Sequence, residues 1–197
     1  MRAPSIWYLA RLEAPDLSVR GATLPGVPGV IIGQNRSIAW GLTSLEPDVQ
    51  DLYIEKTDPA DPSRYFFRDE WRTFETRTER IRVRGKPDDP FTVRSSVHGP
   101  IVTNVLAGAG ELAASELGVA GLGAPVALRW TGLDPGDTTA EAFFRINSAG
   151  GWEEFVAGAA LLRSPAQNLT YADVDGHIGY TASGAIPVPV SLTLMRT

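Results

Sequence analysis

The chain has 197 residues, of which 43% are hydrophobic and 21% are charged, with a formal net charge of -5 and no cysteine. This composition is typical of one globular domain, and the acidic balance gives no electrostatic footprint for nucleic acid or an anionic membrane, so neither is an expected partner. The absence of cysteine excludes a disulfide framework, a thiolate zinc site and a thiol nucleophile.

The N-terminal third of the chain predicts a series of strands. Its first 16 residues hold only short apolar runs interrupted by Arg11 and Glu13, which match neither a signal peptide nor a membrane-spanning helix. Runs rich in β-branched and aromatic residues are then separated by Pro, Gly and Asn. We expect strands within residues 5–13, 17–24, 29–35, 37–44 and 49–56.

Residues 64–102 alternate charged and apolar side chains at period two, with the turn "KPDDP" between the two halves. This pattern predicts a solvated antiparallel hairpin or meander. The charges are mixed in sign, which favours a half-exposed sheet face over a basic binding patch. Residues 104–124 are rich in Gly and Ala and predict a surface loop or a short helix, and another strand is expected within residues 125–134.

Two helices are expected between residues 138 and 163. The first would be capped by Thr138 or Thr139, and the second would follow the Gly150-Gly151 break. Their predicted core faces carry Ala140, Phe143 and Phe144 in the first helix, and Trp152, Phe155, Val156, Ala159 and Ala160 in the second. A hairpin around Asp175-Gly176 then completes an α+β fold of mostly antiparallel strands.

Few residues in the sequence are candidates for a catalytic or metal-binding role. In "EPDVQDLY", Asp48 and Asp51 with the intervening Gln50 carbonyl offer the oxygen ligands of a hard cation such as Ca²⁺, although loop aspartates also cap backbone amides. His98 and His177 each adjoin a turn glycine without a second ligand at metal spacing, which favours structural roles. No G-x-S-x-G elbow is present, and the glycines of "GVPGVIIG" precede neither a lysine nor a helix. Spacing alone leaves the function open.

Four segments in order carry a family resemblance: "LPGVPGVIIGQNRSIAWGLTSLEPDVQDLYIE", "SSVHGP", "LRWTGLDP" and "QNLTYADVDGHIGY". Together they resemble the penicillin acylase family of N-terminal nucleophile hydrolases, and specifically an internal piece of the β subunit. The resemblance implies one partial domain over residues 1–187, truncated at both ends, and a non-matching tail over 188–197. It also implies part of a four-layer αββα sandwich.

The resemblance further implies a catalytic arrangement. Family members use an N-terminal Ser whose own α-amino group, with a pKa of about 8, is the base. One oxyanion donor is the backbone N–H after the Trp-Gly-x-Thr segment, which is Ser44 here. The family's nucleophile would lie upstream of Met1 and its second oxyanion donor, an asparagine, past Thr197, so we expect neither in this chain.

The resemblance implies a structural Ca²⁺ bound by Asp48, the Gln50 carbonyl and Asp51, with further ligands from missing segments. It places the acyl pocket at Ile32, Leu42 and Trp130, for which plain core packing is an equal alternative. The implied substrate is an acylated amine or a β-lactam-type or lactone-bearing small molecule. The implied protein partners are the α chain and the remaining β-chain segments, in a periplasmic or extracellular parent.

Three hypotheses follow from these residues. The first is a fragment of a penicillin-acylase-like amidohydrolase that lacks its own nucleophile. The second is a catalytically inactive remnant that acts as a scaffold or as a ligand- or Ca²⁺-binding module. The third is complementation by a separate polypeptide that supplies the nucleophile.

Overall fold

The computed structural model describes residues 5–103, 105 and 124–188. The chain forms two compact units, the first from residues 1–49 and 134–197 and the second from residues 50–133. Every strand pair in the described part of the chain is antiparallel, and the first unit contains two α-helices. The predicted α+β class with mostly antiparallel strands is therefore confirmed.

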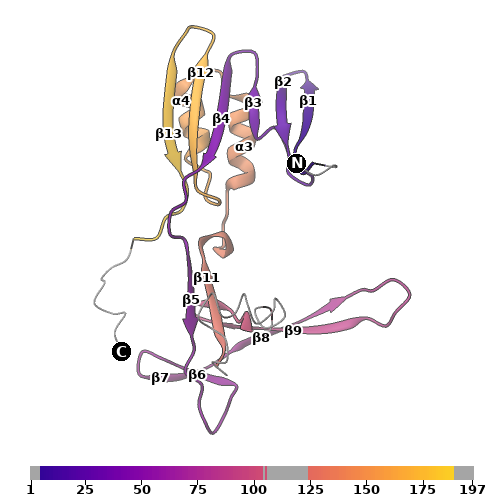
Figure 1. Ribbon diagram of the computed structural model, residues 1–197, viewed down its shortest axis with the longest axis vertical. Coiled ribbons are helices and arrows are strands. Elements are labelled where there is room, and N and C mark those ends of the chain that lie inside the picture. The colour runs from indigo at the N-terminus through magenta and orange to yellow at the C-terminus, as the bar shows by residue number, and fades with distance from the viewer. Residues whose placement is uncertain (1–4, 104, 106–123, 189–197) are drawn as a thin grey trace. The chain divides into compact units, whose positions relative to one another are not determined.

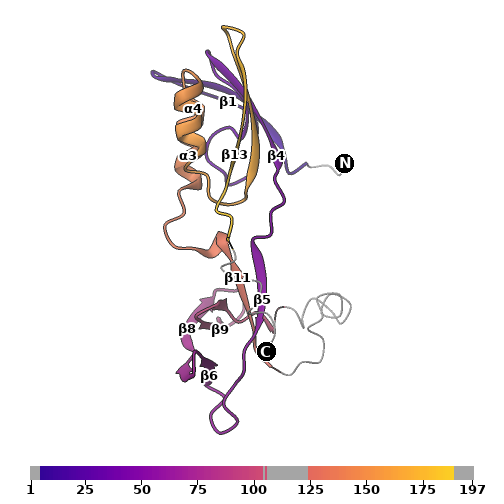
Figure 2. The ribbon, with the colours of Figure 1, turned by 90° about the vertical axis from the view of Figure 1, so that its left-hand side faces the viewer.

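The first unit is a six-stranded sheet with helices on one face (Figure 1 and Figure 2). In spatial order its strands are β1 (Tyr8–Ala14), β2 (Leu17–Thr23), β3 (Ile32–Gln34), β4 (Ile38–Ser44), β12 (Gln167–Asp173) and β13 (Ile178–Ser183). The helices are α3 (Thr139–Ser148) and α4 (Trp152–Ala159). The pairing of β4 with β12 joins two of the segments that carried the family resemblance.

One face of this sheet is core and the other is open. Strand residues facing the helices are buried with side chains of α3 and α4: Val19, Ile38, Trp40, Leu169 and Tyr171 meet Ile146, Phe155 and Ala159. Side chains of a strand alternate between the two faces of the sheet. On the opposite face, Leu9 and Ile178 are each 87% exposed and Tyr180 is 59% exposed. The two helices thus cover a single face of the sheet.

The predicted core faces of the helices are only partly correct. In α3 the buried residues are Ala142, Phe143, Ile146 and Asn147, whereas Ala140 is exposed and Phe144 is 56% exposed. The inward stripe is shifted because it includes a polar residue, Asn147, which apolar periodicity does not detect. In α4, Phe155 and Ala159 are buried as expected, but Trp152 and Ala160 are exposed.

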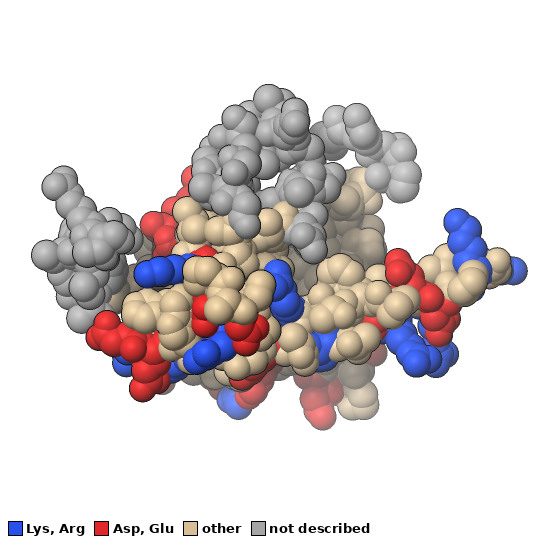
Figure 3. Space-filling model, turned by 90° about the horizontal axis from the view of Figure 1, so that it is seen from below, with Lys and Arg blue, Asp and Glu red and all other residues tan. Residues whose placement is uncertain are grey.

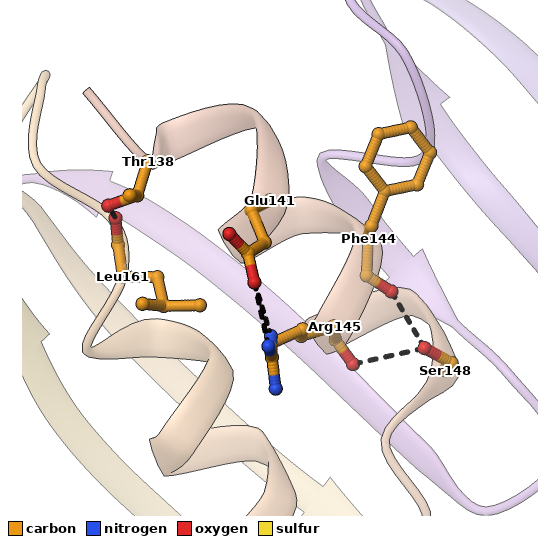
Figure 4. Close-up of polar contacts among 6 residues, drawn as sticks. All are labelled: Thr138, Glu141, Phe144, Arg145, Ser148 and Leu161. Carbon is orange, nitrogen blue, oxygen red and sulfur yellow. Dashed lines mark hydrogen bonds and ion pairs between the residues drawn. The ribbon is translucent and has the colours of Figure 1, made fainter. Parts of the chain in front are cut away.

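Polar contacts tie α3 to the end of α4 (Figure 4). Thr138 occupies the N-cap position of α3, but its side chain does not cap the helix, and its hydroxyl donates to the Leu161 carbonyl at 2.6 Å. On the exposed face of α3, Arg145 and Glu141 form an i,i+4 ion pair with a 2.7 Å contact. The Thr138 contact links the start of α3 to the residues that follow α4.

Asn35 anchors the turn between β3 and β4 to the end of α3. Its Nδ2 group donates to the carbonyls of Asn147, at 3.1 Å, and Ala149, at 2.8 Å. Its Oδ1 atom accepts the N–H groups of Ser37, at 2.8 Å, and Ile38, at 2.9 Å. All four hydrogen-bonding positions of the amide are used, so the entry into β4 is held firmly in place.

The second unit consists of short antiparallel pairs. Strand β5 (Gln50–Ile54) pairs with β11 (Val126–Trp130), and β6 (Arg64–Phe67) pairs with β7 (Glu70–Thr73). Strand β9 (Asp89–Ser96) pairs with both β8 (Glu75–Ile81) and β10 (Gly99–Pro100). A 3-10 turn, Thr131–Leu133, follows β11. Strand β8 is exposed along its whole length, which confirms a solvated hairpin. Acidic and basic side chains are interspersed on the face seen in Figure 3.

Some predicted features lie outside the described residues. They include nearly all of the Gly/Ala-rich stretch 104–124 and, apart from Val188, the tail 188–197. Among the helices of the described ranges, none combines the length and the apolarity that crossing a bilayer requires.

Candidate functional site

Ser44, the predicted oxyanion donor, is the last residue of β4 and is exposed. The next residue, Leu45, donates its N–H to the Ala166 carbonyl at 3.2 Å, on the β12 side. Because consecutive residues of an antiparallel strand direct their N–H groups to opposite sides, the Ser44 N–H points away from β12. On that other side the pairing with β3 reaches only Trp40. Within the described ranges no residue accepts a hydrogen bond from this N–H, so it is available to a ligand.

The Trp-Gly pair before Ser44 holds β4 in position. Trp40 is buried, and its indole Nε1–H donates to the Ile31 carbonyl at 2.8 Å. Gly41 points to the opposite face, where an added Cβ would lie 2.9 Å from the Thr170 Oγ1 atom. The indole fastens β4 to the segment before β3, and the glycine leaves room for the Thr170 hydroxyl on the other face of the sheet.

The three predicted pocket residues fall in different surroundings. Ile32 and Leu42 are half-buried, and both pack against one cluster in the first unit, formed by Ile31, Ala142, Phe143 and Leu162. Trp130 is half-buried at the end of β11 in the second unit, opposite Gln50 in the strand register. The fold therefore brings Ile32 and Leu42 together beside an apolar surface.

The predicted calcium ligands have free oxygen atoms. Asp48 and Asp51 are exposed, and within the described part of the chain neither carboxylate has a hydrogen bond or an ion pair. Glu55 donates its N–H to the Pro125 carbonyl at 2.8 Å, on the β11 side. Because the backbone groups of successive residues alternate between the two sides of a strand, the Gln50 carbonyl points away from β11. Two carboxylates and one carbonyl suit a hard cation, but Ca²⁺ takes roughly six to eight oxygens, so this donor set fits as part of a site.

The turn of the β12–β13 hairpin gathers Asp173, Asp175 and His177, whose possible ligand atoms lie within 4.8 Å of one another. The Asp173 carboxylate is already committed. Its Oδ1 atom accepts the N–H groups of Asp175 and His177, at 3.0 and 2.9 Å, and its Oδ2 atom accepts the Tyr171 hydroxyl at 2.9 Å and contacts His177 Nδ1 at 3.0 Å. These residues line a cavity of about 920 Å³ between the turn and the start of α4.

The contacts of Asp173 shift two pKa values in opposite directions. Burial alone would raise the pKa of Asp173, but the hydrogen bonds from His177 and Tyr171 outweigh it and lower that pKa to about 2. Burial, and then the hydrogen bond to the Asp173 carboxylate, raise the pKa of Tyr171. The cluster therefore stabilises the hairpin turn around an ionised aspartate.

His98 also has a structural setting, in the second unit. Its Nδ1 atom lies 2.8 Å from Oε1 of Glu55, which is buried, and its ring stacks on Tyr53 at a centroid distance of 4.0 Å. The ring also makes a T-shaped contact with Phe67 at a centroid distance of 5.5 Å. Both histidines are thus hydrogen-bonded to carboxylates next to turns.

A comparison with protein families decides the assignment. The penicillin amidase family model matches residues 1–193. The chain belongs to the penicillin amidase family. The matched range extends into the segment 188–197 that the four motifs left unmatched, and the domain boundary at residue 187 stays a prediction.

Individual members of the penicillin amidase family show the same similarity. The chain is 29% identical, over 92% of its length, to acyl-homoserine lactone acylase QuiP of Pseudomonas fluorescens strain Pf-5, and 31% identical, over 94%, to penicillin G acylase of Escherichia coli. It spans about a fifth of these relatives, 21% and 20% of their lengths. The thermostable penicillin G acylase of Alcaligenes faecalis superposes with a TM-score of 0.75 at 31% identity, covering 92% of this chain and 30% of that one.

The sequence motifs of the penicillin amidase family do not by themselves show the roles of two of their residues. The turn pattern around Asn35 does not indicate the four hydrogen bonds through which its amide positions β4. The Trp-Gly-x-Thr pattern likewise does not indicate that the Trp40 indole donates to the Ile31 carbonyl. An asparagine in a turn directly before a buried strand was the available signal.

Proposed function

We propose that this chain is part of an amide hydrolase that releases an acyl group from a small amine, including amines that carry a β-lactam or a lactone. The observation that carries the proposal is the Ser44 N–H, which points away from β12 beyond the last residue that pairs with β3. Membership of the penicillin amidase family and the printed names of the relatives support the substrate class.

The proposed role of Ser44 is electrostatic. When a nucleophile attacks an amide carbonyl, negative charge develops on its oxygen, and a backbone N–H already in position stabilises that charge without reorganising. The backbone of Ser44 is positioned through Trp40 and Asn35, so its N–H is held before substrate arrives. The nucleophile in this proposal is an N-terminal serine on a segment outside this sequence, with its α-amino group as base.

Ile32 and Leu42, both in the first unit, are the proposed walls for the acyl chain. The two aliphatic side chains lie half-buried beside a cluster of buried apolar residues, so an apolar acyl group would extend a core that already exists. This arrangement favours hydrophobic over charged acyl groups.

A structural Ca²⁺ is the proposed cofactor. Asp48, Asp51 and the Gln50 carbonyl would hold it together with oxygens from elsewhere, and when bound it would supply rigidity rather than reaction chemistry. The residues of this chain would brace the segment that follows Ser44.

The proposed protein partners are the α chain and the other β-chain segments of the family. Their docking surface would be the open face of the six-stranded sheet, where Leu9, Ile178 and Tyr180 are exposed. Covering such apolar side chains with a second layer stabilises a sheet that is otherwise half solvated.

The test is amine release by the complete protein isolated from its source. Benzylpenicillin and N-acyl-homoserine lactones with short and long chains are supplied, and the freed primary amine is measured. We expect hydrolysis, and we expect Leu42→Trp to reduce kcat/KM more for long than for short acyl chains. Ile54→Trp, at an exposed position of β5, is the matched control. If a protein that begins with serine released no amine from any of these compounds, the scaffold hypothesis would replace this proposal.

A further inference from the structure

Arg163 is an unusual basic residue in the connection between α4 and β12. It is the only Lys or Arg within residues 146–195. It is half-buried, whereas the other arginines described in the first unit are exposed, namely Arg11, Arg20, Arg36 and Arg145. A cation in this setting needs a physical explanation, because arginine is rarely buried unless it is paired.

The backbone of Arg163 is held on two sides. Its N–H donates to the Thr139 Oγ1 atom at 3.1 Å, and its carbonyl accepts the Ala185 N–H at 2.7 Å. The Thr139 hydroxyl also accepts the Ser164 N–H at 3.1 Å. The side chain therefore starts from a fixed point where α3, the α4–β12 connection and the end of β13 meet.

The guanidinium has no anionic partner among the residues that the structure describes. Its Nε atom is buried without a hydrogen bond, and within the described ranges no carboxylate forms an ion pair with Arg163. Asp137, the acidic residue bonded to Thr139, already accepts the Thr139 N–H at 3.0 Å and hydroxyl at 2.7 Å. At the end of α4, the Ala159 carbonyl accepts the Ser183 hydroxyl and the Leu162 N–H. Asp137 Oδ1, the Thr139 hydroxyl and the Ala159 carbonyl thus already accept hydrogen bonds.

Burying a charged donor without a partner is costly, and the cost is removed when an anion binds. A carboxylate matches the planar fork of a guanidinium and gives strong, charge-assisted hydrogen bonds. Arg163 lies just before β12, whose first residue, Gln167, is opposite Ser44. The unpaired cation is therefore attached at the end of the sheet that carries the proposed oxyanion donor.

We propose that Arg163 binds a carboxylate at the Ser44 end of the first unit. The carboxylate belongs either to the amine half of the substrate, which rests on the proposed function, or to the protein itself. In the first case Arg163 sets a preference for acyl amines that carry a carboxylate over those that are neutral.

The test uses ligand-dependent thermal stability in a buffer free of carboxylates. N-phenylacetylglycine carries a carboxylate, and phenylacetylglycinamide differs from it in being neutral. Arg163→Met keeps most of the apolar stem and removes the charge, Arg163→Lys keeps the charge and loses the fork, and Arg36→Met is the exposed control. Thermal stability needs no catalysis, so a failure of the proposed function is distinguishable from a failure at Arg163.

If the carboxylate belongs to the substrate, N-phenylacetylglycine raises the Tm of the unsubstituted protein and the neutral amide does not. The apparent affinity for it then falls about 10- to 100-fold in Arg163→Met, as expected for charged hydrogen bonds. In the absence of ligand, Arg163→Met melts at a higher temperature than the unsubstituted protein because an unpaired, half-buried charge is gone.

A carboxylate of the protein itself predicts the opposite pattern without ligand: Arg163→Met melts at a lower temperature, Arg163→Lys is intermediate, and neither compound changes the Tm. The proposal is overturned if Arg163→Met has the Tm of Arg36→Met and the two compounds bind parent and variant alike.

Discussion

Asn147 and Val30 exchange two hydrogen bonds in the interior of the first unit. The Val30 N–H donates to Asn147 Oδ1 and the Asn147 Nδ2–H donates to the Val30 carbonyl, both at 2.7 Å. Both residues are buried. A side chain of α3 thereby completes the hydrogen bonding of the segment that leads into β3, because a buried backbone group needs a partner.

We expect Asn147→Ala to destabilise the fold strongly. It leaves the Val30 N–H and carbonyl without partners, at about 1–3 kcal/mol each, so the free energy of unfolding falls by about 2–6 kcal/mol. Ser148→Ala, at the exposed neighbouring position, is expected to change it by no more than about 0.5 kcal/mol. Urea denaturation measures both. Equal midpoints for the two variants would show that the paired hydrogen bonds contribute nothing.

Asp173 gives the hairpin a predicted acid sensitivity. Its pKa in the folded protein is about 2, below the ordinary value of 3.8. The unfolded chain therefore binds the proton more readily, and the stability contributed by Asp173 is fully present above about pH 4 and is lost as the pH falls through 4 toward 2.

The measurement is Tm between pH 2 and 6 for the parent, Asp173→Asn and the control Asp175→Asn. The parent and the control are expected to lose Tm steeply on the acid side, whereas Asp173→Asn starts lower and declines less. If Tm fell equally with decreasing pH in the unsubstituted protein and in Asp173→Asn, the proposed contribution of Asp173 to stability would be contradicted.

Calcium should stabilise the complete protein through Asp48. A cation bound only by the native state raises Tm by mass action, and a chelator removes the effect. We expect Asp48→Asn to abolish most of the difference in Tm between added Ca²⁺ and chelator, and Asp88→Asn, an exposed position in the β8–β9 turn, to preserve it. A parent whose Tm is the same with Ca²⁺ and with chelator would remove calcium from the proposal.

The strands were predictable because their signals are local. The runs at 17–24 and 37–44 became β2 and β4, and the Asp175-Gly176 turn joins β12 to β13. Period-two alternation and turn residues act over a few positions, so they are legible in a single sequence.

The polar interior was not predictable in the same way. Nothing near Asn147 in the sequence indicates that it faces Val30, because that contact depends on how α3 packs. The exposure of Phe144 follows from the same rotation of the helix. For the candidate site, the family motif located Ser44, but the direction of its N–H required the register of β4 with β12 and with β3.

The most direct test of the central claim compares kcat for Ser44→Pro and Ser44→Ala in the complete protein. Proline removes the N–H, and alanine keeps it. Since this N–H does not pair with β12, both variants should fold, which circular dichroism verifies. The account predicts a kcat for Ser44→Pro about 10²- to 10³-fold below that of Ser44→Ala, the loss expected on removing one oxyanion donor. A folded Ser44→Pro variant with the kcat of Ser44→Ala would contradict it.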